Sequence, residues 1–148
     1  MKLLSTALIF ALTIACSADS LRAELKLSAV FGDHMVVQQK QPVRIWGWTN
    51  PGQNVTVEFA DQTARTVAAD DGRFELSLKP VNAGGPYTLT VAADETKTFE
   101  DVLVGEVWLC SGQSNMQWAV NSADDPDLES LTANYPQLRL ISVPQVGT

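Results

Sequence analysis

The sequence predicts an α+β chain of more than one domain, in which an immunoglobulin-like β-sandwich precedes the truncated start of an α/β domain. Three observations support this. Residues 24–104 consist of short runs of alternating apolar and polar residues, separated by turn signals. After Gly105 the alternation stops and a continuous apolar run begins, which is typical of a strand buried on both faces. The 148 residues are 45% hydrophobic and 18% charged, which excludes a disordered chain.

The expected strands of the sandwich follow one another along residues 24–104. The clearest is 73–79, where Phe74, Leu76 and Leu78 alternate with polar residues. Turns are expected at 50–52, at Asp71-Gly72 as a compact hairpin, and at 83–86 as a break in the chain. The full set of expected strands is 27–31, 35–39, 43–48, 54–59, 63–69, 73–79, 87–91 and 97–104.

Residues 105–148 read as the first part of an α/β domain. The apolar run 105–111 predicts a buried strand, and the residues from Met116 to Val120 predict a short helix. Asp127 can cap a second helix that extends through Ala133, and 138–143 predicts the next strand. Cys110, at the end of an apolar strand, is expected to be buried and inert.

Ser114 falls where the predicted strand turns into the predicted helix. In open α/β sheets, ligands and catalytic groups gather at this carboxyl end of a strand. Gly112 leaves room for a sharp turn, and Gln113 and Asn115 are expected to hold it by side-chain hydrogen bonds. Met116 replaces the second glycine of the Gly-x-Ser-x-Gly elbow. The residues alone therefore leave two interpretations of Ser114, a nucleophile or a helix cap.

Residues 1–23 have the pattern of a secretory signal peptide. Lys2 is followed by a mostly apolar run that ends before Asp19, which is too short for stable membrane insertion. The chain is therefore expected to be exported, to the periplasm or outside the cell, with cleavage after Ala18 or Ala23. The residues before Cys16 partly match a lipoprotein box, which leaves lipid anchoring at Cys16 as an alternative.

Composition excludes several classes of site. The net charge is −7 and there is no basic cluster, which argues against a nucleic-acid partner. With two cysteines and one histidine, no disulfide scaffold, Cys-rich zinc site or multi-histidine metal site is expected. His34 beside Asp33 is either a base with its orienting group or part of a tight turn. Trp46 and Trp48 share a face, for packing or for stacking on a sugar.

Three segments of the chain resemble one family. Residues 103–116, which contain Gly112-Gln113-Ser114-Asn115-Met116, are similar to the first catalytic block of the sialate O-acetylesterases, which are SGNH (GDSL-like) hydrolases. Residues 31–39, 43–48 and 83–91 are similar to the N-terminal β-domain of that family. The match runs in order over 27–143, and assigns 105–148 to the N-terminal part of an SGNH hydrolase domain.

This resemblance implies an exported carbohydrate O-acetylesterase. Ser114 would attack the acetyl carbonyl of an O-acetylated sugar, its backbone N–H would donate to the oxyanion, and water would release acetate. The resemblance implies no metal or organic cofactor. In the family the Asp-x-x-His that activates the serine lies far downstream, beyond Thr148. The 148-residue chain is therefore expected to be inactive alone and to need the C-terminal part of the enzyme as a partner. The alternative is a non-catalytic β-sandwich that binds glycans or packs, followed by a remnant hydrolase segment.

Overall fold

A computed structural model describes residues 24–143, which form a β-sandwich followed by a mostly irregular segment. The predicted signal peptide and Cys16 lie outside the described residues. The strands and helices are β1 (Lys26–Leu27), β2 (Val36–Gln38), β3 (Val43–Trp48), β4 (Asn54–Phe59), β5 (Gln62–Val67), β6 (Arg73–Leu78), β7 (Gly84–Ala92), β8 (Thr96–Gly105), η1 (Ser114–Gln117), η2 (Val120–Ser122) and α1 (Pro126–Thr132).

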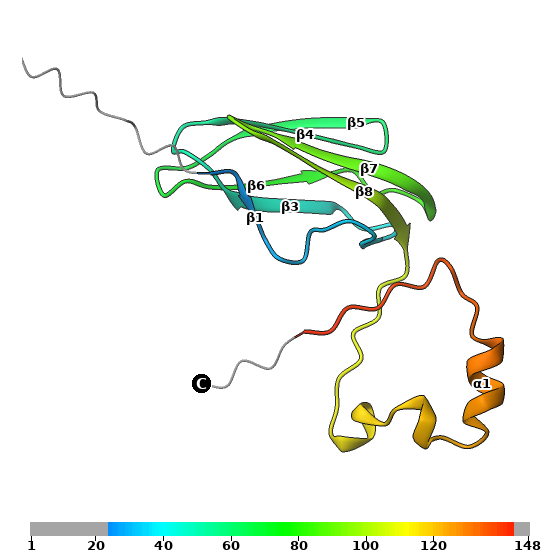
Figure 1. Cartoon of the computed structure of the whole chain (residues 1–148). Coiled ribbons are helices and arrows are strands. Elements are labelled where there is room, and N and C mark those ends of the chain that lie inside the picture. The colour runs from blue at the N-terminus through cyan, green and yellow to red at the C-terminus, as the bar shows by residue number, and fades with distance from the viewer. Residues whose placement is uncertain (1–23, 144–148) are drawn as a thin grey trace, which may run out of the picture.

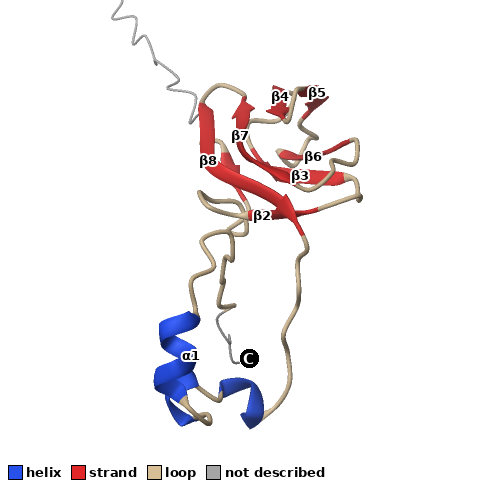
Figure 2. Ribbon diagram, turned by 90° about the vertical axis from the view of Figure 1, so that its right-hand side faces the viewer, coloured by secondary structure: helices blue, strands red, loops and turns tan. Residues whose placement is uncertain are grey.

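The strands form two sheets that pack face to face (Figure 1). The three-stranded sheet has the order β1-β3-β6 and is antiparallel. The five-stranded sheet has the order β2-β8-β7-β4-β5, in which β2 and β8 are parallel and the other pairs are antiparallel. The view in Figure 2 shows the strands gathered in one body and the helices in another part of the chain.

The core lies between the two sheets because alternate residues of each strand point inward. In β4 the inward residues Val55, Val57 and Phe59 are at most 2% exposed, while Glu58 faces water. In β6 the same alternation buries Phe74, Leu76 and Leu78, as predicted. The core is completed by Leu25, Val43, Ile45, Ala68, Leu89, Val91, Val102 and Val104.

The turns differ from the prediction in one respect. Asp71-Gly72 was expected to close a hairpin, but β5 pairs with β4 and β6 pairs with β3, so this turn passes from one sheet to the other. The hairpin is instead β4–β5, whose two turn residues, Ala60 and Asp61, both have a left-handed backbone (φ 47° and 59°). A two-residue turn with two positive φ values matches the twist of the strands, although glycine or asparagine is usual there.

The predicted break at 83–86 is part of a strand. β7 begins at Gly84, and its pairing with β8 shifts register between Gly84 and Tyr87 and again between Tyr87 and Leu89. Glycine and proline interrupt the regular ladder here without ending the strand, as expected for an irregular strand end.

The predicted α/β domain start is not formed, so the prediction of an α+β fold is wrong and the structure is mostly β. Neither 105–111 nor 138–143 pairs as a strand after β8 ends at Gly105. The second predicted helix is present as α1, but its N-cap residue is Asp125, which makes no side-chain capping bond, and Asp127 lies in the first turn after Pro126. Among residues 24–143, no strand lies beside either predicted strand. An isolated strand has no partner for its backbone groups, so these apolar runs stay irregular.

Candidate functional site

Ser114 is the first residue of η1 and is exposed. The preceding residue, Gln113, has an extended backbone (φ −100°, ψ −153°), and the Met116 N–H donates to the Gln113 carbonyl at 2.9 Å. The backbone therefore changes from extended to helical at the predicted position, but out of an irregular segment and not out of a sheet strand. The role of Ser114 as a nucleophile stays a prediction.

The turn that carries Ser114 depends on a close approach at Gly112. A Cβ atom at this position would lie 2.6 Å from Cγ of Met116, closer than side-chain atoms pack. The turn is held by backbone bonds, including one from the Trp118 N–H to the Asn115 carbonyl at 3.3 Å. The side-chain hydrogen bonds expected from Gln113 and Asn115 do not occur among the described residues.

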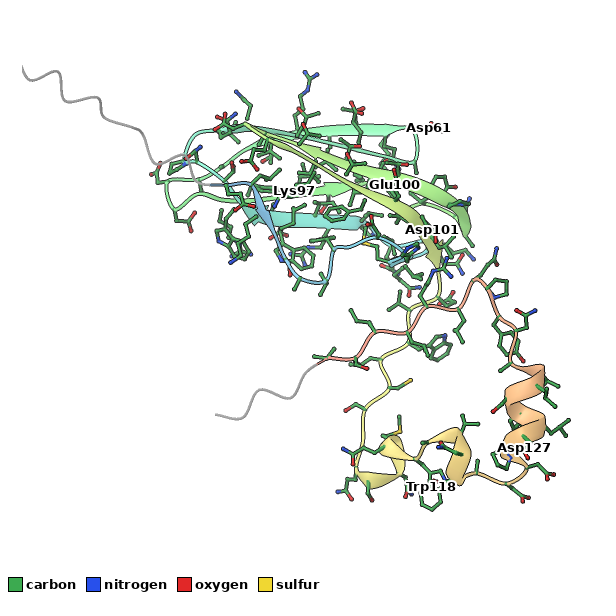
Figure 3. The ribbon with its side chains drawn as sticks, in the orientation of Figure 1. Asp61, Lys97, Glu100, Asp101, Trp118 and Asp127 are labelled. Carbon is green, nitrogen blue, oxygen red and sulfur yellow. The ribbon has the colours of Figure 1, made fainter. Side chains whose placement is uncertain are left out.

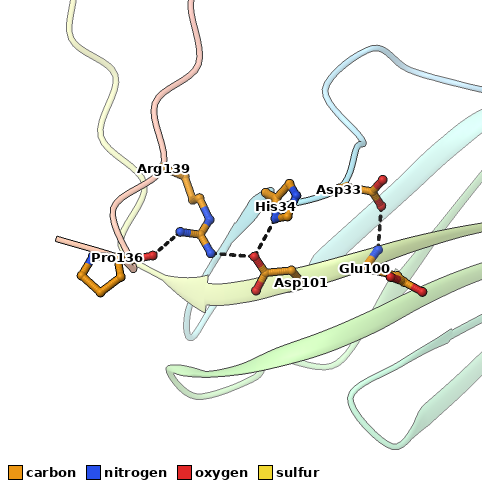
Figure 4. A network of polar contacts seen from close by, with 6 residues as sticks. All are labelled: Asp33, His34, Glu100, Asp101, Pro136 and Arg139. Carbon is orange, nitrogen blue, oxygen red and sulfur yellow. Dashed lines mark hydrogen bonds and ion pairs between the residues drawn. The ribbon is translucent and has the colours of Figure 1, made fainter. Parts of the chain in front are cut away.

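The histidine of the sequence is held by a carboxylate, but not by its neighbour. His34 Nδ1 lies 2.6 Å from Asp101 Oδ2, and Asp33 instead accepts the backbone N–H of Glu100 at 2.7 Å (Figure 4). Both His34 and Asp101 have left-handed backbones (φ 62° and 52°). Such a conformation is uncommon for non-glycine residues, and the hydrogen bonds of this cluster hold it in place.

Arg139 joins this cluster from the far end of the irregular segment. Its Nη2 donates to Asp101 Oδ2 at 2.7 Å, and its Nη1 donates to the Pro136 carbonyl. The hydrogen bond from His34 and the charge and hydrogen bond of Arg139 lower the pKa of Asp101. Asp101 therefore stays ionised and ties the segment to β8.

The cluster lies away from Ser114. Figure 3 places Asp101 on β8 in the sandwich, and Trp118, which directly follows η1, in the part of the irregular segment that lies far from the sandwich. His34 bonds to Asp101, so the structure does not bring the only histidine of the sequence to the Ser114 hydroxyl. A serine needs an adjacent base to act as a nucleophile near neutral pH.

A second attachment fixes the start of the segment. Glu106, directly after β8, accepts hydrogen bonds from the side-chain amides of Gln38 (3.1 Å) and Gln39 (2.5 Å). These two bonds lower the pKa of Glu106, and the Val107 N–H donates to Gln38 Oε1 at 2.8 Å. The chain thus leaves the sandwich in a defined direction before reaching Ser114.

Between these attachments the segment exposes its apolar side chains. From Glu106 to Val143, only Pro126 and Arg139 are not exposed. Trp108 is 82% exposed and Leu140 90% exposed. Cys110 is an exposed free thiol, so its predicted burial is wrong because the strand that would have buried it is not formed. An exposed thiol and many exposed apolar side chains therefore follow from the missing sheet around this segment.

The two tryptophans of β3 share a face, as their alternation with Gly47 predicted, and this face points out of the sandwich. Trp46 is half-buried, because its ring packs edge-to-face on Phe31 with 4.8 Å between the ring centroids. Trp48 is 43% exposed. Trp46 thus has a packing contact, while Trp48 presents much of its ring to solvent.

Residues 24–143 contain no group of three or more His, Cys, Asp or Glu side chains that could hold a metal ion. None of the helices in this part of the chain is long and apolar enough to cross a membrane.

Comparison with known proteins identifies the relatives of this chain. It is 35% identical to mouse sialate O-acetylesterase in an alignment of 129 residues that covers 78% of this chain. It is 37% identical to human sialate O-acetylesterase in an alignment of 122 residues that covers 73% of this chain. The chain is a homologue of the sialate O-acetylesterases. The predicted resemblance is thus confirmed, although no family model matches the chain. The chain spans about a quarter of the length of these curated relatives (24% and 23%).

The same relationship appears in three dimensions. The structure matches the crystal structure of a carbohydrate acetylesterase from Xanthomonas citri with a TM-score of 0.72 and 36% sequence identity. The match covers 76% of this chain and 26% of that protein.

Sequence reasoning missed both attachments of the segment. It did not pair Arg139 with Asp101, or Gln38 and Gln39 with Glu106, and it did not find Asp101 as the partner of His34. The register of the parallel pair β2–β8, in which Gln38 lies opposite Gly105, brings these residues together. Hydrogen-bond partners that lie more than 60 residues apart in the chain cannot be recognised from a local sequence pattern.

Proposed function

We propose that this chain is part of an exported carbohydrate O-acetylesterase of the SGNH type, with Ser114 as its nucleophile. The observation that carries the proposal is the homology to proteins named sialate O-acetylesterase and to a carbohydrate acetylesterase. The exposed position of Ser114 in a tight turn after Gly112 is consistent with a hydroxyl that must meet a substrate.

In this proposal, the Ser114 hydroxyl adds to the acetyl carbonyl of an O-acetylated sugar and the sugar hydroxyl leaves. Water then adds to the acyl-enzyme, which releases acetate and restores Ser114. The base that takes the serine proton is not His34, which faces Asp101 on the sandwich. The 148-residue chain alone is therefore proposed to be inactive, and to need the C-terminal part of an acetylesterase as its partner.

A chimaera tests the role of Ser114. Residues 24–143 replace the aligned segment of the Xanthomonas citri enzyme, and acetate release from an acetylated sugar is measured. The chimaera is expected to be active, and Ser114→Ala to lower the rate by about a thousandfold or more. Cys110→Ala, which removes the other candidate nucleophile of this segment, serves as the control and leaves the rate unchanged. Activity retained in Ser114→Ala contradicts the proposal.

The 148-residue chain is assayed separately for the predicted inactivity. Acetyl-ester hydrolysis that Ser114→Ala abolishes in this chain contradicts the proposed need for a further part. Hydrolysis that instead disappears in His34→Gln assigns the base to the sandwich.

Export is proposed from the sequence of residues 1–23. The test is expression in a bacterial host, followed by fractionation and mass measurement of the product. Cleavage after Ala18 or Ala23 gives a soluble product in the periplasm or the medium, whereas lipidation at Cys16 leaves it in the membrane fraction. An uncleaved protein in the cytosol contradicts export.

A further inference from the structure

We propose that the outer face of the three-stranded sheet binds a carbohydrate, through Trp46 and Trp48, and that its preferred ligand is a pyranose carrying a carboxylate. The inference does not depend on the role of Ser114. It rests on the aromatic side chains of β3 and on the charged side chains opposite them in β1 and β6.

The two tryptophans lie on one side of a rigid strand. Ile45 and Gly47 of β3 point into the core, so Trp46 and Trp48 point outward together. Phe31 contacts the Trp46 ring edge-to-face (69° between the rings), which fixes it. The 43% exposure of Trp48 is measured with residues 106–143 in place, so that segment leaves the ring open. Two aromatic side chains on one strand, with the Trp46 ring held by Phe31, form a partly preorganised platform.

This platform suits a sugar because of how both surfaces are built. One side of a pyranose ring presents C–H bonds, and its rim presents hydroxyl groups. The face of a tryptophan is apolar and electron-rich, so it attracts weakly positive C–H groups while excluding water. The hydroxyl groups at the rim of the sugar then need polar side chains beside the tryptophan rings. Ligand sites commonly combine an apolar surface with a few polar groups in this way.

The platform has such polar partners. In the register of the sheet, Lys26 of β1 and Arg73 of β6 flank Trp48 on its two sides, and Glu75 of β6 lies opposite Trp46. Arg44 Nε donates to Glu75 at 2.9 Å, and Arg73 Nη2 donates to it at 3.3 Å. Both arginines and Glu75 are thereby oriented at the edge of the rings.

The charges of this face select an anionic ligand. Lys26, Arg44 and Arg73 lie on this face with Glu75, which pairs with both arginines, in a chain whose net charge is −7. Among residues 24–143, Lys26 forms no ion pair, so its ammonium group is free to meet the carboxylate of a sugar beside Trp48. A neutral sugar gains only the stacking contact.

The experiment titrates the isotope-labelled 148-residue chain with sodium glucuronate and with glucose at constant ionic strength, and follows the tryptophan indole N–H signals by NMR. The Trp48 signal, assigned by its absence in Trp48→Ala, is expected to shift saturably at millimolar glucuronate. Trp48→Ala is expected to weaken binding about tenfold. Trp108→Ala, which removes a more exposed tryptophan elsewhere, leaves binding unchanged.

A second pair of variants tests the charge. Lys26→Gln is expected to weaken glucuronate binding about threefold without affecting glucose. Arg65→Gln, which removes an exposed cation on the outer face of the other sheet, has no effect. Glucose binding as tightly as glucuronate refutes the anionic preference. No saturable shift at about 100 mM of either sugar, or a shift caused by protein concentration alone, refutes the carbohydrate site.

Discussion

Replacing Gly47 by alanine tests the packing that positions the tryptophan face. An added Cβ would lie 2.4 Å from the carbonyl oxygen of Lys26 and 3.0 Å from two ring atoms of Phe74. To relieve the first contact, the Lys26 backbone must move by about 1 Å, which breaks the pairing of Leu27 with Gly47 in a strand of two residues. Overpacking of this kind costs about 2–3 kcal/mol. We expect Gly47→Ala to lower the free energy of unfolding by that amount.

The measurement is urea unfolding followed by circular dichroism of the strands. Gly32→Ala is the matched control, because a Cβ at Gly32 meets nothing within 4 Å. It is expected to change the free energy of unfolding by less than about 0.5 kcal/mol. If Gly47→Ala unfolds at the same urea concentration as Gly32→Ala, β1 is not packed against β3 as described.

Three further outcomes are expected. The double substitution Ala60→Asn with Asp61→Gly should stabilise the protein by about 1 kcal/mol in urea unfolding, because both positions have positive φ; equal or lower stability contradicts the strained turn. Because the pKa of Asp101 is lowered on folding, its stabilising effect is present above the unfolded pKa near 3.8 and is lost as pH falls through the folded pKa. Asp101→Asn should therefore reduce the fall in the free energy of unfolding between neutral and acid pH, measured by urea unfolding at each pH. The same pH dependence in Asp101→Asn and the unchanged protein contradicts this role of Asp101. Cys110 should react fully with a thiol reagent without denaturant, and protection would contradict its exposure.

The sandwich could be predicted because its signals are local. The strands β4 and β6 alternate apolar and polar residues without interruption. The predicted and observed bounds of these two strands and of β3 agree within one residue. The Ala60-Asp61 hairpin could not be predicted, since neither residue favours a left-handed backbone as glycine does. The strand partners on either side of Asp71-Gly72 could not be predicted either. The same turn sequence can join two paired strands of one sheet or two strands of different sheets.

The segment after Gly105 shows the limit of the same approach. An apolar run such as 105–111 indicates that a strand would be stable if other strands flanked it. Whether they do is a long-range property, and among the described residues none does. The bend at Ser114 was predictable because glycine and the helical residues after it act locally. The partners of His34 and Glu106 were not, because β2 and β8 meet only in the folded sheet.

The irregular segment starts and returns on the same strand. It leaves β8 at Glu106 and comes back to β8 through Arg139 and Asp101, so its path is a closed loop that begins and ends at this strand. The entropic cost of closing such a loop grows only with the logarithm of its length, by about 0.6 kcal/mol for each doubling. Insertions within this loop therefore lower the free energy of unfolding of the sandwich only slightly. The loop can accept added residues while its two attachments, at Glu106 and at Arg139, stay in place.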